Sequence, residues 1–86
     1  MAGAVTVMVY KKKDGYPAKG TKVKGYYAGI FMTTYPTQEV KTDSSGRAVL
    51  TWDSDPKYLV EIYIAGEKHK GKFLAGSTQS FQTTRG

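Results

Sequence analysis

Cysteine is absent from this 86-residue chain and histidine occurs once, so catalysis by a cysteine nucleophile or by a pair of histidines is excluded. Without cysteine the protein has no disulfide framework, no thiolate metal site and no cysteine nucleophile. A Ser-His-Asp set would need the lone His69, and no serine stands in a nucleophile-elbow motif. These absences predict a protein that is not an enzyme and that holds no metal or cofactor.

Long apolar segments are missing as well. No run approaches the roughly 18 consecutive apolar residues that a membrane-spanning helix needs. No basic segment followed by an apolar one opens the chain, as a signal peptide would. The lack of cysteine fits a reducing compartment. We therefore expect a cytoplasmic protein as the chain stands, or a domain excised from a secreted or surface protein.

The apolar residues that are present alternate with polar residues, which is the pattern of β-strands with one buried face. Alternation in "AVTVMVY" places its three valines on one face. In "YLVEIYIA" it places Val60, Ile62 and Ile64 on one face. In "TKVKGYYA" Val23 is expected to face inward between lysines, and Gly25 marks a candidate bulge.

Turn-forming residues recur about every 8–12 positions, as in "DSSG" and "DSDPK", and no segment has the apolar spacing of an amphipathic helix. The pattern predicts an all-β protein, a single antiparallel β-sandwich of about seven strands. One domain is expected to span residues 1–86, with 1–3 and 83–86 as frayed tails.

Three segments with turn glycines and apolar strands follow one another in order. They are "DGYPAKGTKV" at residues 14–23, "VKTDSSGRAVLTW" at 40–52 and "YLVEIYIAG" at 58–66. The set resembles the carboxypeptidase regulatory-like domains of the transthyretin-like (prealbumin-type) β-sandwiches, and it is similar to bacterial immunoglobulin-like modules. The resemblance implies a transthyretin-like or Ig-like sandwich whose matched residues are scaffold. It also implies a spacer or a protein- or carbohydrate-binding module.

One group of transthyretin-like proteins, the hydroxyisourate hydrolases, ends in a Tyr-Arg-Gly-Ser signature. This chain ends in Thr84-Arg85-Gly86, without the tyrosine or the terminal serine. That family also uses more than one active-site histidine, whereas His69 is alone here. Hydrolysis of this type is therefore a minor alternative.

The segment "GEKHKGKF" has nearly the glycine and lysine spacing of a phosphate-binding loop and follows a predicted strand. Such a loop requires Ser or Thr directly after its lysine and a helix beyond it. Here Phe73 follows Lys72, and "FLAGSTQSFQTT" has no helical pattern. We therefore predict the glycine-flanked turn of a β-hairpin, with Lys68, Lys70 and Lys72 on its solvated side and His69 exposed among them.

A net charge of +6 and seven tyrosines suggest a second kind of partner. Small basic β domains bind single-stranded nucleic acid by stacking bases on surface aromatic residues in a basic groove. Only two arginines are present, however, and lysines also keep β-sheet proteins soluble. Single-stranded nucleic acid is therefore the alternative partner. The candidate polyanion contacts are Lys11, Lys12, Lys13, Lys22, Lys24, Lys68, Lys70 and Lys72.

The segment "GIFMTTYPT" combines apolar and aromatic residues without regular alternation, which is typical of a contact loop. Its candidate partner contacts are Ile30, Phe31, Met32 and Tyr35. The alternative is that Ile30 and Phe31 plug one end of the sandwich. Free sheet edges would also permit a homodimer by edge-strand pairing. The sequence as a whole predicts a non-catalytic structural or interaction module with a protein or carbohydrate partner.

Overall fold

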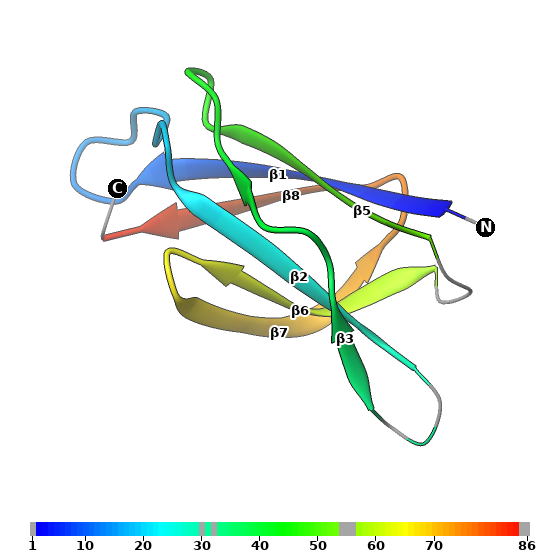
Figure 1. The fold of residues 1–86 in the computed structure, drawn as a ribbon. Helices are drawn as coiled ribbons and strands as arrows, with labels where there is room; N and C mark the ends of the chain where they lie inside the picture. Colours follow the sequence, from blue (N-terminus) through cyan, green and yellow to red (C-terminus); the bar gives the residue numbers. More distant parts are fainter. Residues whose placement is uncertain (1, 30, 32, 54–56, 85–86) are drawn as a thin grey trace.

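The protein is an all-β sandwich of two packed sheets, which confirms the predicted fold class (Figure 1). The computed structural model describes residues 2–29, 31, 33–53 and 57–84. Within that part of the chain, no helix is long and apolar enough to cross a membrane. The strands are β1 (Ala2–Lys11), β2 (Lys22–Ala28), β3 (Thr34–Pro36), β4 (Val40–Lys41), β5 (Arg47–Asp53), β6 (Tyr58–Ile64), β7 (Glu67–Leu74) and β8 (Thr78–Thr83).

The small sheet has the strand order β5-β1-β8, and the large sheet has the order β3-β2-β6-β7 with β4 also pairing with β2. Every pair is antiparallel except β1 and β8, which run parallel from Thr6 opposite Thr78 to Lys11 opposite Thr83. The parallel pair arises because the chain leaves β7 in the large sheet and crosses to the small sheet before β8 begins. Figure 1 shows β1 between β5 and β8 in one layer.

The core lies between the inner faces of the two sheets, and the alternation predicted for β1 is confirmed because its three valines are fully buried. Trp52, near the end of β5, is buried with them. Fully burying a Val, Leu or Ile side chain contributes about 1.5–3 kcal/mol, so these few positions dominate the stability of so small a domain. The buried apolar residues are Val5, Val7, Val9, Ala18, Val23, Ala48, Leu50, Trp52, Leu59, Ile62, Ile64 and Phe73.

The predicted inward face of β6 is wrong at one position, because Leu59 is buried and Val60 is only half-buried. The register between β6 and β7 shifts between Leu59 and Glu61. In this interval Gly71 and Lys72 on β7 lie opposite the single residue Val60, so the alternation changes phase. Strict period-two reading of one strand cannot reveal a shift that its partner strand imposes.

The bulge expected at Gly25 is absent, since the pairing of β2 with β6 continues through it without a shift. Its lack of a side chain serves close packing instead. A Cβ at Gly25 would lie 2.7 Å from Leu59 Cδ1 and 3.1 Å from Leu50 Cδ1. The glycine therefore leaves room for two core leucines from opposite sheets.

The turn predicted across "GEKHKG" is also misplaced. Ala65 and Gly66 form the connection, with positive φ angles of 51° and 85°. Positive φ at both central residues is the requirement of a type I′ hairpin, which Asn-Gly or Asp-Gly usually meets. Because alanine seldom adopts this conformation, a turn was not predicted at Ala65 and Gly66. Consequently β7 starts at Glu67, and the lysines that follow lie on a strand.

The "DSSG" turn is confirmed, and it links β4 in the large sheet to β5 in the small sheet. Asp43 Oδ1 accepts hydrogen bonds from the backbone N–H groups of Ser45 at 2.9 Å and Arg47 at 3.0 Å. These donors lower the pKa of the Asp43 carboxyl, with the Arg47 N–H the larger cause. Gly46 has a φ of 75° and lies against the Val9 carbonyl, so a side chain there would meet both strain and backbone.

Part of each predicted tail is paired within a strand. Gly3 pairs with Trp52 across β1 and β5, and Thr83 is buried at the end of β8. Residues 2, 3 and 83 therefore belong to strands, whereas 1, 85 and 86 lie outside the described residues. The centre of the predicted "DSDPK" turn, residues 54–56, also lies outside them.

Candidate functional site

The outer face of the large sheet gathers lysines and tyrosines from four strands, β2, β4, β6 and β7. Because neighbouring side chains of a strand point to opposite sides, burial of one set exposes the other. The register places Lys24 on β2 opposite Tyr63 on β6, and Tyr63 opposite Lys68 on β7. We call this surface the basic face; it comprises Lys22, Lys24, Tyr26, Lys41, Tyr58, Glu61, Tyr63, Lys68, Lys70 and Lys72.

The aromatic rings of this face contact one another and the lysines. The rings of Tyr26 and Tyr63 meet edge to face, with centroids 5.4 Å apart and an interplanar angle of 64°. Lys24 Nζ lies 5.7 Å from the Tyr26 ring centroid, and Lys72 Nζ lies 5.0 Å from that of Tyr58. Both distances fall within the range of cation–π attraction. The ammonium groups are thus held beside the tyrosine rings.

The charges on the basic face are incompletely balanced. Glu61 forms an ion pair with Lys68 at 3.7 Å. Lys22 lies directly opposite Lys41 across the β2–β4 pair, and like charges in that arrangement destabilise a sheet. Among the described residues, neither of these two lysines has an ion-pair partner. The face therefore carries excess positive charge that a bound anion would relieve.

One end of the basic face is hollowed, with a volume of about 550 Å³. Three lysines line it, Lys19, Lys22 and Lys24, together with the Tyr26–Tyr63 pair. Glu39 and the backbone around Gly20 and Gly66 complete the wall. The hollow thus places positive charge beside two aromatic rings.

Buried threonines hold the segment that carries Lys19. The Thr21 N–H donates to Thr42 Oγ1 at 2.9 Å, and the Thr42 N–H donates to the Thr21 carbonyl at 2.9 Å. The Thr42 hydroxyl in turn donates to the Ala18 carbonyl. Because buried polar groups are costly unless hydrogen-bonded, this satisfied set favours one backbone position for the rim of the hollow.

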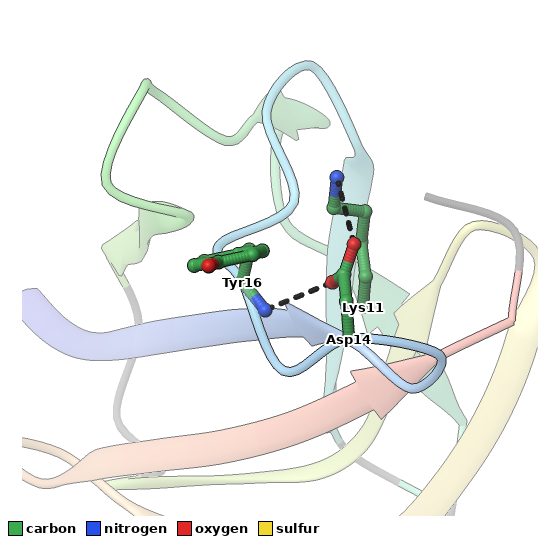
Figure 2. Close-up of polar contacts among 3 residues, drawn as sticks. All are labelled: Lys11, Asp14 and Tyr16. Atoms are coloured by element: carbon green, nitrogen blue, oxygen red, sulfur yellow. Dashed lines mark hydrogen bonds and ion pairs between the residues drawn. The ribbon is translucent and has the colours of Figure 1, made fainter.

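The remaining predicted lysines lie away from the basic face, at the end of β1 and in the loop that follows. The Asp14 carboxylate accepts a hydrogen bond from the Tyr16 N–H at 3.0 Å and lies 3.7 Å from Lys11 Nζ (Figure 2). That contact partly neutralises Lys11 and shapes the turn. Lys12 and Lys13 are exposed and line a separate hollow of about 370 Å³ with Lys11, Thr83 and Thr84.

The structure therefore divides the eight predicted lysines into two groups. Lys22, Lys24, Lys68, Lys70 and Lys72 share one face, whereas Lys11, Lys12 and Lys13 do not lie on it. Lys41 and Tyr63 were not among the residues predicted for this site. Alternation within "KVKGYYA" and "EIYIA" was the available signal, but only the register between strands brings these residues together.

The outer face of the small sheet differs in composition, and we call it the neutral face. Its described side chains include only two charged groups, Arg47 and Asp53, which have opposite signs. The face comprises Ala4, Thr6, Met8, Tyr10, Arg47, Val49, Thr51, Asp53, Thr78, Ser80 and Gln82.

The hairpin formed by β2 and β3 extends beyond the rest of the sandwich (Figure 1). Phe31 near its tip is 94% exposed and has a positive φ of 59°. Tyr35 on β3 is 44% exposed, and its ring lies 5.9 Å from that of Tyr27. The alternative that Phe31 plugs the sandwich is therefore wrong, while Ile30 and Met32 lie outside the described residues.

His69 lies on β7 and is half-buried, which corrects the prediction of an exposed turn residue. Its ring packs 4.8 Å from that of Phe81 on β8. Its Nε2 atom is buried and has no hydrogen-bond partner among the described residues. Because the segment is a strand, Gly66 and Gly71 cannot bring backbone N–H groups together as a phosphate-binding loop does.

No protein-family model matches the sequence, and no curated protein matches it. Among solved structures, the chain is similar to the crystal structure of a 9R-lipoxygenase from Cyanothece PCC8801, with a TM-score of 0.62 and 11% sequence identity. The match covers 96% of this chain and 16% of the lipoxygenase chain. At this identity the likeness shows a shared fold alone, so the transthyretin-like resemblance stays a prediction.

Proposed function

We propose that the chain is a non-catalytic interaction module that binds single-stranded nucleic acid through the basic face. The observation that carries the proposal is the uneven distribution of charge between the two outer faces. Lysines that served only solubility would be expected on both faces, since both are exposed to water. Their concentration beside tyrosines on one face favours a ligand that is both anionic and able to stack.

The arrangement of side chains supports a specific mode of binding. Residues two apart on a strand are about 7 Å apart, and adjacent strands are about 4.8 Å apart. The register therefore places Tyr63 between Lys24 and Lys68 in a row across three strands. Bases would stack on Tyr63 and Tyr26, while phosphates contact the lysines. Lysine acts as a mobile point charge, so binding would tolerate many sequences.

Fluorescence anisotropy with labelled single-stranded DNA and RNA across a salt series tests this function. If about four phosphates are neutralised, the slope of log K against log salt should be about −2.8. An abasic phosphodiester strand of equal length is the matched control, because it keeps the charges and removes the bases. It should bind more weakly than the base-containing strand.

Two results would contradict the proposal. Absence of binding near physiological salt would leave the lysines as solubility charges and favour a protein or carbohydrate partner. If the abasic strand bound with equal affinity, base stacking on the tyrosines would not contribute to binding. The tyrosines would then be structural residues, and any polyanion could be the ligand.

A protein partner is the second candidate, and the exposure of Phe31 favours it. Phe31 and Tyr35 both expose aromatic surface on the protruding β2–β3 hairpin, and contiguous exposed apolar surface is typical of a contact site. A photo-crosslinking phenylalanine analogue at position 31 tests this candidate in a cell extract. The same analogue at Tyr16, another exposed aromatic residue, is the control. A distinct crosslinked protein should appear with the probe at position 31 and not at position 16.

A further inference from the structure

The four sheet edges are protected from edge-to-edge pairing to different degrees. An exposed edge strand is a template for another strand unless it is short, charged, bulged or interrupted by proline. β3 has three residues and ends at Pro36, β7 carries lysines and a register shift, and β5 is contacted by β2 and β4. β8 has none of these devices: its sequence "TQSFQT" has no charge and no proline, and its pairing with β1 is unbroken.

The backbone groups on the free side of β8 can be identified from its bonds to β1. The Ser77 carbonyl accepts from the Thr6 N–H at 3.0 Å, and the Thr83 carbonyl accepts from the Lys12 N–H at 2.9 Å. Backbone groups of successive residues in a strand point to alternate sides. Thr78, Ser80 and Gln82 therefore direct their N–H and C=O groups away from β1, toward the free edge.

The apolar layer beneath this edge is incompletely covered. Phe81 points inward from β8, where its ring lies 4.8 Å from His69 and 5.9 Å from Phe73. It is nevertheless only partly buried, although it packs against the core. A further strand beside β8 would shield the exposed part of this ring from water.

We propose that β8 forms the interface of a symmetric homodimer, pairing antiparallel with β8 of a second copy about a two-fold axis at Ser80. Ser80 then lies opposite Ser80 of the partner subunit, and Thr78 lies opposite Gln82 of the partner subunit. Uncharged polar pairs of this kind stabilise an antiparallel ladder, and no like charges face each other. The three strands of each copy join into one continuous sheet.

Self-complementarity is the reason to assign the edge to a second copy. In this register all three outward-pointing residues of one strand meet outward-pointing residues of the other, so every free N–H and C=O on the edge finds a partner. A contact about a two-fold axis pairs the same surface patch of both copies, so that patch must complement itself. The edge of β8 meets this requirement because it carries no charged residue that would face its own copy. The same pairing through β7 would set Lys68, Lys70 and Lys72 near their own copies.

The salt dependence of this dimer has a definite sign. Two copies of charge +6 repel, and salt screens that repulsion, so dimerisation should strengthen as salt rises. Nucleic-acid binding should weaken over the same range. The two activities are therefore distinguishable in one salt series, and failure of either leaves the other testable.

Sedimentation velocity over a wide range of protein concentration tests the proposal. The wild-type chain should shift from its monomer mass of 9.5 kDa to twice that value as concentration rises, and more readily at high salt. Ser80→Pro removes the outward N–H without touching the β1 pairing, and edge strands tolerate proline. Ser80→Lys places two like charges at the two-fold axis. Both variants should remain monomeric, whereas Ser80→Thr should still dimerise.

Circular dichroism and Trp52 fluorescence establish that each variant is folded, and two different disruptive variants guard against one that misfolds. Two outcomes overturn the proposal. One is a wild-type chain that stays at the monomer mass at every concentration and salt. The other is a dimer that persists unchanged in both folded Ser80→Pro and Ser80→Lys variants.

Discussion

The two outer faces of the sandwich are built by the same alternation of strand residues, yet they differ in chemistry. The basic face of the large sheet carries six lysines and three tyrosines, whereas the neutral face carries one charge of each sign among its described residues. Folding constrains the inward positions of both sheets equally, because both must fill one core. The outward positions are free of that demand. Under the proposed function, their difference reflects what each face contacts.

The largest expected effect comes from removing charge from the basic face. Replacing Lys22, Lys24, Lys68 and Lys70 with glutamine lowers the net charge from +6 to +2. If each lysine contacts one phosphate, single-strand affinity at 0.1 M salt should fall about 600-fold, and the log–log salt slope should flatten by about 2.8. Anisotropy titration measures both quantities.

The matched control removes the same charge from outside the basic face, through glutamine at Lys12, Lys13, Arg47 and Lys57. This control variant also has a net charge of +2. Its affinity for single strands should fall far less than that of the basic-face variant. Equal losses in the two variants would show that only net charge matters, which would remove the distinction between the faces.

A tyrosine substitution isolates stacking from charge. Tyr63→Ala should weaken binding by about 1–3 kcal/mol, or roughly 5- to 150-fold, because a base loses its aromatic platform. Tyr10→Ala makes the same change on the neutral face and should leave the affinity unaltered. The salt slope should stay constant in both variants, since no phosphate contact is lost. A larger loss of affinity from Tyr10→Ala than from Tyr63→Ala would mean that the ligand binds to the small sheet.

The opposed lysines of β2 and β4 predict a conflict between stability and binding. Lys41→Glu replaces a like-charge pair with an opposite-charge pair facing Lys22. Urea denaturation should show a free energy of unfolding higher by about 0.2–1 kcal/mol. The same variant should bind nucleic acid more weakly. Lower stability in the variant would indicate that the two lysines do not repel each other in the folded protein.

The smallest effect concerns the turn that joins the two sheets. The folded-state pKa of Asp43 is below its ordinary value of 3.8, because the N–H groups of Arg47 and Ser45 donate to the carboxylate. The ionised carboxylate therefore stabilises the fold above the unfolded pKa, and this contribution disappears as pH falls through the folded pKa. The stability advantage of wild type over Asp43→Asn should shrink below about pH 4. If the difference in stability between wild type and Asp43→Asn did not change with pH, the ionised Asp43 carboxylate would not be what stabilises the turn.

Local patterns in the sequence were enough to predict part of the fold. The valines of β1 and the Asp43–Gly46 turn were both placed correctly, since each depends on residues close in sequence. The phase change at Val60 was not, because it depends on an extra residue in β7. The hairpin at Ala65 and Gly66 was misplaced because alanine occupies a conformation that usually calls for asparagine or aspartate.

The candidate site was predicted only in pieces. Lys68, Lys70 and Lys72 were assigned to a turn, and the lysines of β1 and β2 were grouped by their nearness in sequence. In the structure Lys24 and Lys68 lie on either side of Tyr63, although they are far apart in the chain. The exposure of Phe31 likewise depends on how far the β2–β3 hairpin extends beyond the sandwich. The residues of the hairpin do not by themselves predict that length.

The sequence by itself determined the all-β class, the positive charge and most of the residues that fill the core. These follow from alternation, composition and turn chemistry, which act over a few residues. The tertiary structure decided which lysines share a face, which tyrosines join them and which edge is left unprotected. Those properties depend on strand register and sheet order, which are set by pairing between segments distant in the chain.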